Sequence, residues 1–60
     1  MTQYQKGVLV MNYLESLGVR YIAIGQAVCD KNLEQSYKLI KENPKISKAE
    51  FLEKMQISED

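Results

Sequence analysis

The sequence has no histidine, no tryptophan and one cysteine, and these absences exclude several kinds of site. A lone Cys29 cannot form a disulfide within the chain, and without histidine the Cys/His set of a structural zinc site is missing. The usual base that activates a thiol nucleophile is missing too. We therefore predict a non-enzymatic protein with no metal and no cofactor. A free thiol is typical of a reducing compartment, so we expect a cytoplasmic protein.

The chain also lacks an excess of either charge and a long hydrophobic run. Eight basic and eight acidic side chains cancel, whereas a dedicated nucleic-acid-binding protein usually has a basic excess. No segment approaches the roughly 20 apolar residues that span a bilayer, and the N-terminal segment is a poor signal peptide. A chain of 60 residues is predicted to form one domain over 1–60. Because so small a domain is only marginally stable, we expect very good packing or a partner subunit.

Apolar and charged residues are distributed unevenly. Residues 1–29 contain 17 of the 27 apolar residues, counted along the sequence, but only three charged ones. Residues 30–60 contain the other 13 charged residues. The stretch GVRYIAIGQAVC, residues 18–29, has a single charge and must be covered by something. The N-terminal half is therefore predicted to supply more apolar surface than one small core needs.

The first helix is predicted over about 4–17 and ends at Gly18, a typical C-terminal stop. Its apolar face is assigned to Tyr4, Val8, Met11, Leu14 and Leu17, and it is widened by Leu9, Val10 and Tyr13. This face covers far more of the helix circumference than the stripe of about 100° that surface helices usually have.

Two further helices are predicted in the C-terminal half. One runs from Asn32 or Asp30, either of which is a suitable cap, to about Asn43. Its buried stripe is predicted to consist of Leu33, Tyr37 and Ile40, with Leu39 off the stripe. The last helix covers about 48–56. It follows a capping box of Ser47 and Glu50 and a hydrophobic staple of Ile46 and Phe51, and it is buried through Phe51, Leu52 and Met55, with Ile57 closing its end.

Residues 19–29 fit two interpretations. As a strand, residues 19–24 would be apolar on both faces and would need a neighbouring strand, which the chain does not provide. As a helix, one stripe contains Ile22 and Cys29 in line with Leu33, and a second contains Tyr21, Ile24 and Val28. Gly25 would cost this helix about 1 kcal/mol relative to alanine. The helix is the preferred interpretation, either continuous with the next helix or broken at Asp30.

The predicted fold is all-α, with three or four short helices in a compact bundle completed by homodimerisation. The alternative is an α+β fold in which a single strand at 19–24 pairs across a dimer. Short connections make successive helices antiparallel neighbours. The predicted dimer or partner interface consists of Tyr4, Val8, Met11, Tyr13, Tyr21, Ile24 and Val28. Homodimers are the commonest oligomers, and large exposed apolar patches mark interaction sites.

The remaining candidate residues have simpler interpretations. Cys29 is expected to be a small buried hydrophobe. A polar partner face is assigned to Lys38, Lys41, Lys45 and Lys48, but glutamates are interleaved and the lysines fit a solvated face better. Glu59 and Asp60 are expected to belong to a frayed acidic tail.

The predicted function is that of a small regulatory protein, an adaptor or inhibitor, that binds another protein as a homodimer. By association alone, this description also suits an accessory protein of bacteria or phages. The alternative is a small dimeric DNA-binding transcriptional regulator. In that hypothesis residues 4–17 and 19–29 form a helix-turn-helix, but its second helix offers base edges only Arg20 and Gln26. Residues 47–58 resemble only the first helix and turn of such a motif.

Overall fold

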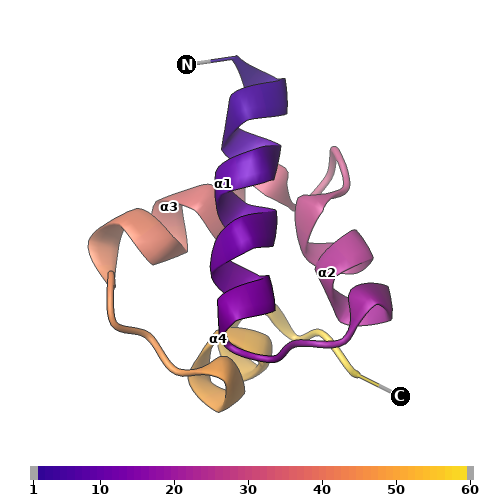
Figure 1. The fold of residues 1–60 in the computed structure, drawn as a ribbon, viewed down its shortest axis with the longest axis vertical. Helices are drawn as coiled ribbons and strands as arrows, with labels where there is room; N and C mark the ends of the chain where they lie inside the picture. The colour runs from indigo at the N-terminus through magenta and orange to yellow at the C-terminus, as the bar shows by residue number, and fades with distance from the viewer. Residues whose placement is uncertain (1, 60) are drawn as a thin grey trace.

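Four α-helices make up the fold of the computed structural model, which describes residues 2–59 (Figure 1). They are α1 (Gln3–Ser16), α2 (Tyr21–Val28), α3 (Leu33–Glu42) and α4 (Lys48–Met55). Helix α1 packs against α2 on one side and α3 on the other, and α4 packs against α3. The all-helical prediction is confirmed, since residues 2–59 contain no strand.

Within residues 19–29 the segment Tyr21–Val28 is a helix, so the strand alternative is wrong. The carbonyl of Arg20 accepts from the amides of Ala23 and Ile24, both at 3.0 Å, and this begins α2. A strand here would have left its backbone groups without a partner, because no other extended segment is available in residues 2–59. Helices α2 and α3 are separate because Cys29 has an extended backbone.

Helix α1 has a well-defined signal at each end. Its start is a capping box that the sequence analysis did not identify. The Thr2 hydroxyl accepts from the Gln5 amide at 3.2 Å, and the Gln5 side-chain carbonyl accepts from the Thr2 amide at 3.0 Å. At the other end Gly18 has φ +81, and the Val19 amide reaches back to the Leu14 carbonyl at 3.1 Å. This is a Schellman motif, and it confirms Gly18 as the stop.

Helix α4 ends in the same motif without a glycine. Gln56 takes the left-handed conformation, φ 57, and its amide donates to the Glu53 carbonyl at 3.1 Å. The Ile57 amide donates to the Leu52 carbonyl at 3.0 Å. Left-handed backbone costs a non-glycine residue about 1–2 kcal/mol, so this helix end is strained where that of α1 is not.

The two predicted caps of the C-terminal half have different outcomes. The Ser47 hydroxyl accepts from the Glu50 amide at 3.2 Å, which confirms it as the cap of α4. At α3 the expected cap is wrong. The Asn32 side chain makes no capping bond and instead donates to the Gln26 carbonyl at 2.9 Å. The side chain therefore ties the α2–α3 turn to α2.

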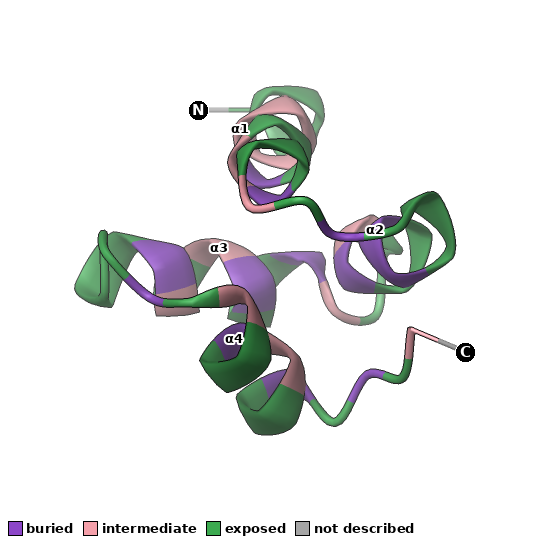
Figure 2. Ribbon diagram, turned by 60° about the horizontal axis from the view of Figure 1, so that its bottom comes forward, coloured by how far each residue is buried: buried purple, intermediate pink, exposed green. Residues whose placement is uncertain are grey.

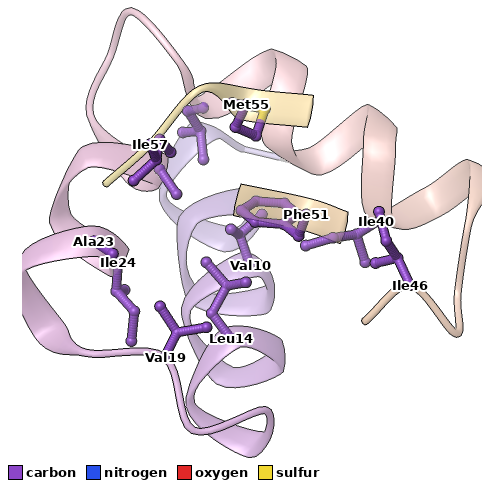
Figure 3. Packing of buried hydrophobic residues seen from close by; sticks show 12 residues of the cluster. Val10, Leu14, Val19, Ala23, Ile24, Ile40, Ile46, Phe51, Met55 and Ile57 are labelled. Carbon is purple, nitrogen blue, oxygen red and sulfur yellow. The ribbon is translucent and has the colours of Figure 1, made fainter. Parts of the chain in front are cut away.

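The core lies where the four helices meet, and both halves of the chain supply it equally (Figure 3). Val10, Leu14 and Phe51 are fully buried at its centre. Each half contributes six of the twelve buried apolar residues, which are Val10, Leu14, Val19, Ala23, Ile24 and Ala27 from the first and Leu33, Ile40, Ile46, Phe51, Met55 and Ile57 from the second. The predicted staple of Ile46 and Phe51 and the predicted burial of Met55 and Ile57 agree with this set.

The predicted buried faces of α1 and α2 are partly wrong. In α1 the buried residues are Val10 and Leu14, whereas Tyr4 is 80% exposed. In α2 the buried residues include Ala23 and Ala27, not Ile22 and Cys29. Ala23, Ile24 and Ala27 form the packed side of α2, and Ile22 on the opposite side is left outside. Apolar character alone does not show which side of a helix packs.

The core is closed within a single chain. Residues 18–29 lie against α1 and α3, and Ile57 of the C-terminal segment belongs to the same cluster (Figure 3). The accessible surface is 4138 Å², close to the roughly 4000 Å² expected for a folded monomer of this mass. A second copy is therefore not needed to cover this stretch. Any interface has to be sought among the side chains that remain exposed.

The segment after α4 lies against the start of α2, so the expected frayed tail is wrong for Glu59. Ile57 is buried, and the Glu59 carboxylate accepts from the Arg20 amide at 3.1 Å at the start of α2. Glu59 also pairs with Lys48 at 3.2 Å. Because α2 has no cap of its own, a residue distant in sequence caps it. Asp60, the other half of that prediction, lies outside the described residues.

Candidate functional site

An open apolar groove runs beside α1, along the junction of α2 and α3. Its volume is about 330 Å³, and its lining consists of Gln3, Tyr4, Gly7, Val8, Met11, Val28, Asp30 and Leu33. We call it the α1 groove. It forms because the buried side of α1, centred on Val10 and Leu14, points into the core, so the adjacent stripe of α1 faces outward beside α2.

The α1 groove brings together four of the seven residues that the sequence analysis placed at an interface: Tyr4, Val8, Met11 and Val28. Tyr4, Val8 and Met11 are four and three residues apart, so they form one stripe of α1. Tyr4 at the groove edge is 80% exposed and Met11 is 37% exposed. The groove therefore presents Tyr4, Val8 and Met11, apolar side chains that lie outside the core cluster, next to Val28 and Leu33, which pack in or against it.

Gly7 lies in the wall of the α1 groove, inside a helix. A Cβ added at Gly7 would meet nothing within 4 Å, so packing inside the chain does not require glycine here. Its absent side chain instead leaves room in the groove. The polar lining residues are Gln3 and Asp30, so the groove carries one carboxylate and no nucleophile paired with a base. Its chemistry suits binding an apolar group.

The other three predicted interface residues lie elsewhere. Ile24 is 3% exposed and belongs to the core, so no partner can contact it on this folded chain. Tyr13 packs against the core and donates to the Ile46 carbonyl at 2.6 Å, which holds the α3–α4 loop on α1. Tyr21 is 78% exposed at the start of α2 and does not line the groove.

The four lysines of the predicted polar face have different neighbours. Lys41 lies over the Tyr37 ring, 5.8 Å from its centroid, and Lys48 is paired with Glu59. Lys45 lines a second open depression together with Glu42 and Glu50. Lys38 is exposed on α3. Carboxylates lie beside several of these lysines, which favours a solvated charged face over a continuous basic surface.

Cys29 is exposed, so its predicted role as a buried hydrophobe is wrong. Its thiol donates to the Gln26 carbonyl at 3.1 Å. The stripe on which the prediction placed it also contains Ile22, and this side of α2 faces away from the core. Within residues 2–59, no three acidic or cysteine side chains gather as they would around a metal ion.

Ser36 is a structural residue that the sequence analysis did not identify. It is fully buried, and its hydroxyl donates to the Ala27 carbonyl at 2.8 Å, linking α3 to α2. A signal was present, because Ser36 lies three residues after Leu33 and four before Ile40, on the stripe that was predicted to be buried. A small hydroxyl on such a stripe is a candidate for a helix–helix hydrogen bond.

Among the described residues, Glu59 is the group whose pKa clearly departs from its ordinary value. The Arg20 backbone amide, which donates to its carboxylate, is the main cause and lowers the pKa of Glu59 below its ordinary value. Loss of hydration is the second cause and raises the pKa, and Lys48 and the charge of Arg20 lower it again. The shift identifies a cap on α2, and Glu59 lies outside the lining of the α1 groove.

On α1 and α3, one cationic side chain connects the two helices. Lys6 pairs with Glu34 at 2.9 Å and lies over the Tyr37 ring, 5.2 Å from its centroid. Tyr37 thus has an ammonium group from each helix near its ring, since Lys41 is the other. This contact links α1 to α3.

No helix in the described part of the chain has the length and apolarity needed to cross a membrane. Comparison with known proteins found no matching family model, no matching curated protein and no matching solved structure.

Proposed function

We propose that this chain is a small non-enzymatic regulatory protein, an adaptor or inhibitor, that acts as a homodimer and binds another protein through the α1 groove. The observation that carries the proposal is the groove itself, with Tyr4 and Met11 exposed and Val8 half-buried beside Val28. Contiguous apolar surface outside a closed core marks an interaction site. Tyrosine at such an edge supplies apolar area and a polar tip, a combination enriched at binding hot spots.

The shape of the α1 groove favours a protein partner over a small molecule. Small-molecule sites enclose most of the ligand surface, and this groove is open along α1. An open apolar channel beside a helix suits one or two anchoring side chains of a partner helix. The groove carries a carboxylate, Asp30, so a partner with a basic residue beside its apolar anchors would be favoured.

The alternative function, DNA binding, has less support. In the helix-turn-helix hypothesis the helix after Gly18 reads the DNA, and that helix is α2. None of its residues, Tyr21–Val28, is charged, so it has no cationic side chain to neutralise a phosphate. The exposed lysines lie on other elements, among carboxylates.

The proposal can be tested with a photo-crosslinking amino acid, p-benzoylphenylalanine, placed at Tyr4 or at Tyr21. These two tyrosines are 80% and 78% exposed, so they form a matched pair that differs in position. In the cells that express the chain, the probe at Tyr4 should form an adduct with a different protein. That adduct should disappear in a Met11→Lys background and persist in a Lys45→Glu background.

Binding of the purified captured protein should then weaken at least tenfold on Met11→Lys, because a charge would enter an apolar contact. An adduct that is indifferent to Met11→Lys would contradict the proposed site. DNA retention at low salt that is lost when Lys41, Lys45 and Lys48 are neutralised would support the transcriptional regulator instead.

A further inference from the structure

The residues after α4 cross from the end of that helix to the start of α2. We call residues 56–59 the strap. They belong to none of the four helices, so their position depends on contacts with neighbouring elements. Figure 2 shows the strap leaving α4 and passing beside α2, with a buried residue between exposed ones. The strap therefore links α4 to α2, two helices that otherwise pack mainly on other elements.

Two contacts of different kinds hold the strap in place. Ile57 is buried and belongs to the apolar core cluster. The Glu59 carboxylate accepts from the Arg20 amide at 3.1 Å and pairs with the Lys48 ammonium group at 3.2 Å. This carboxylate thus joins the start of α2 to the start of α4. The strap has one apolar anchor in the core and one charged anchor that is partly exposed.

Gln56 is the hinge at which the strap leaves α4. Its backbone is left-handed, with φ 57, a conformation that is strained for a residue with a long side chain. Gln56 is exposed, so burial does not offset this strain. Rotation at this residue breaks bonds that the strap makes and none of the hydrogen bonds inside the four helices. The backbone itself therefore favours opening at Gln56.

The closed position of the strap is a balance of opposing contributions. Burial of Ile57 and the two bonds of Glu59 favour it. The left-handed backbone of Gln56 and the ordering of the residues that follow it oppose it. Since one buried side chain has to offset both of these costs, the bonds of the carboxylate decide the balance. Their strength depends on charge, because the carboxylate faces an ammonium group and the positive end of α2.

We infer that the strap is a pH-sensitive latch, which opens as a unit about Gln56 when Glu59 loses its charge, while the four helices stay folded. Opening withdraws Ile57 from the core and uncovers the start of α2. Arg20 and Lys48 are the charged groups that face Glu59, and both stay positive throughout the acid range. Glu59 is therefore the group that titrates in the latch.

The direction of the pH effect follows from the bonds of the closed latch. They favour the ionised carboxylate and lower the pKa of Glu59, so a proton binds more readily to the open form. The closed latch is most stable above about pH 4.3, the ordinary value, and opens as the pH falls below it. None of the strap residues lines the α1 groove. The latch and the proposed function can therefore fail separately.

Amide hydrogen exchange in low concentrations of urea tests whether the strap opens as a unit. The Arg20 amide donates to Glu59, and the Ile57 amide donates to the Leu52 carbonyl at 3.0 Å, so both are released by opening. After correction for intrinsic rates, these two amides should give the same ratio of open to closed chains, with little dependence on urea. The Phe51 amide, bonded inside α4, should exchange only through a larger, steeply urea-dependent unfolding.

A matched pair of carboxylate variants tests the trigger. In the unmodified chain the ratio of open to closed chains should rise as the pH falls from neutral to about pH 3. Glu59→Gln should raise this ratio severalfold at neutral pH and remove its pH dependence, because the carboxylate is absent. Glu53→Gln, on the exposed side of α4, should leave both the ratio and its pH dependence unchanged.

A second set of variants tests the other bond of the carboxylate and the hinge. Lys48→Gln should raise the ratio of open to closed chains, but by less than Glu59→Gln, since the bond to the Arg20 amide remains. Lys54→Gln, exposed on the same helix, should leave it unchanged. Gln56→Gly should lower the ratio about two- to fivefold, because glycine adopts the left-handed backbone without strain.

Three results would overturn the inference. The first is an Ile57 amide that exchanges with the same urea dependence as the Phe51 amide, because the strap would then open only when the whole chain unfolds. The second is an Arg20 amide that opens while the Ile57 amide stays protected, because the carboxylate would then leave without the strap. The third is a Glu59→Gln variant that keeps the pH dependence of the unmodified chain.

Discussion

The two halves of the chain differ strongly in composition but contribute equally to the core. Residues 1–29 contain most of the apolar residues, residues 30–60 contain most of the charges, and each half supplies six buried apolar side chains. The core has a fixed capacity, so the apolar residues that the N-terminal half has in excess remain outside. They line the α1 groove and lie on the exposed side of α2. A half that is richer in apolar residues therefore contributes more exposed apolar surface and no more core.

Helix α2 shows the contrast most clearly, because one lysine substitution there should have the largest effect of all and another, two residues away, almost none. Ile24→Lys would place an unpaired charge in the core and should cost at least about 4 kcal/mol, enough to unfold so small a domain. Ile22→Lys, two residues away and 58% exposed, should change the free energy of unfolding by less than about 0.5 kcal/mol. Urea titration at low concentration, followed by circular dichroism, measures both. Equal effects would show that α2 packs through a different side.

A buried hydrogen bond joins the two halves, from the Ser36 hydroxyl to the Ala27 carbonyl. Serine substitutions should show that losing this bond costs more stability than losing a bond at the surface. Ser36→Ala leaves the Ala27 carbonyl without this donor in the core and should cost about 1–2 kcal/mol. Ser16→Ala removes a bond of similar length, from the Ser16 hydroxyl to the Tyr13 carbonyl at 2.6 Å, but at the surface. It should cost less than about 0.5 kcal/mol. Equal losses of unfolding free energy in the two variants would show that burial does not strengthen the Ser36 bond.

Each half contains one helix that ends in a Schellman motif, with Gly18 in the first and Gln56 in the second. Gln56→Gly should raise the free energy of unfolding by about 0.5–1 kcal/mol, because it relieves the left-handed strain. Gly18→Ala is the converse change at φ +81 and should lower it by about 1 kcal/mol. Thermal unfolding of both variants gives the comparison. A destabilised Gln56→Gly variant would mean that the glutamine side chain makes a compensating contact.

The smallest effect on stability is expected at Glu59, which lies in the charged half and binds the start of α2 in the apolar half. Its pKa is lowered in the folded chain, so protonation favours the unfolded chain. The stability it contributes is fully present above about pH 4.3, its unfolded value, and is lost as the pH falls through the folded pKa. Glu59→Gln should therefore be less stable than the unmodified chain near neutral pH and equal to it in strong acid. Urea unfolding at several pH values tests this, and a pH-independent difference would rule out the carboxylate.

Much of the fold could be predicted because its signals are local. Gly18 as a helix stop, Ser47 as a cap and the Ile46–Phe51 staple depend on a few neighbouring residues and on backbone geometry. The helical state of residues 19–29 also followed, since an isolated strand has no partner. Signals of this kind do not depend on how the helices are placed in space.

The buried faces could not be predicted fully because they depend on which helices approach closely. Nothing local distinguishes Ala23 and Ala27 from Ile22 as the packing side of α2 until its neighbours are placed. The cap of α2 was hidden for a similar reason, since Glu59 lies 39 residues from Arg20. The groove was predicted in part. The stripe of Tyr4, Val8 and Met11 was recognised as apolar, and the structure shows that it stays outside the core and that Val28 joins it.

The bond between Glu59 and Arg20 also sets an order of events during synthesis. Helix α2 lies in the first half of the chain but receives its cap, and part of its cover through Ile57, from the last residues described. A nascent chain that has exposed only α1 and α2 to solvent holds an uncapped helix with its apolar side uncovered. We therefore expect folding to be completed only after residue 59 has left the ribosome, and truncation just before Ile57 should yield a chain that is complete in helices and deficient in stability.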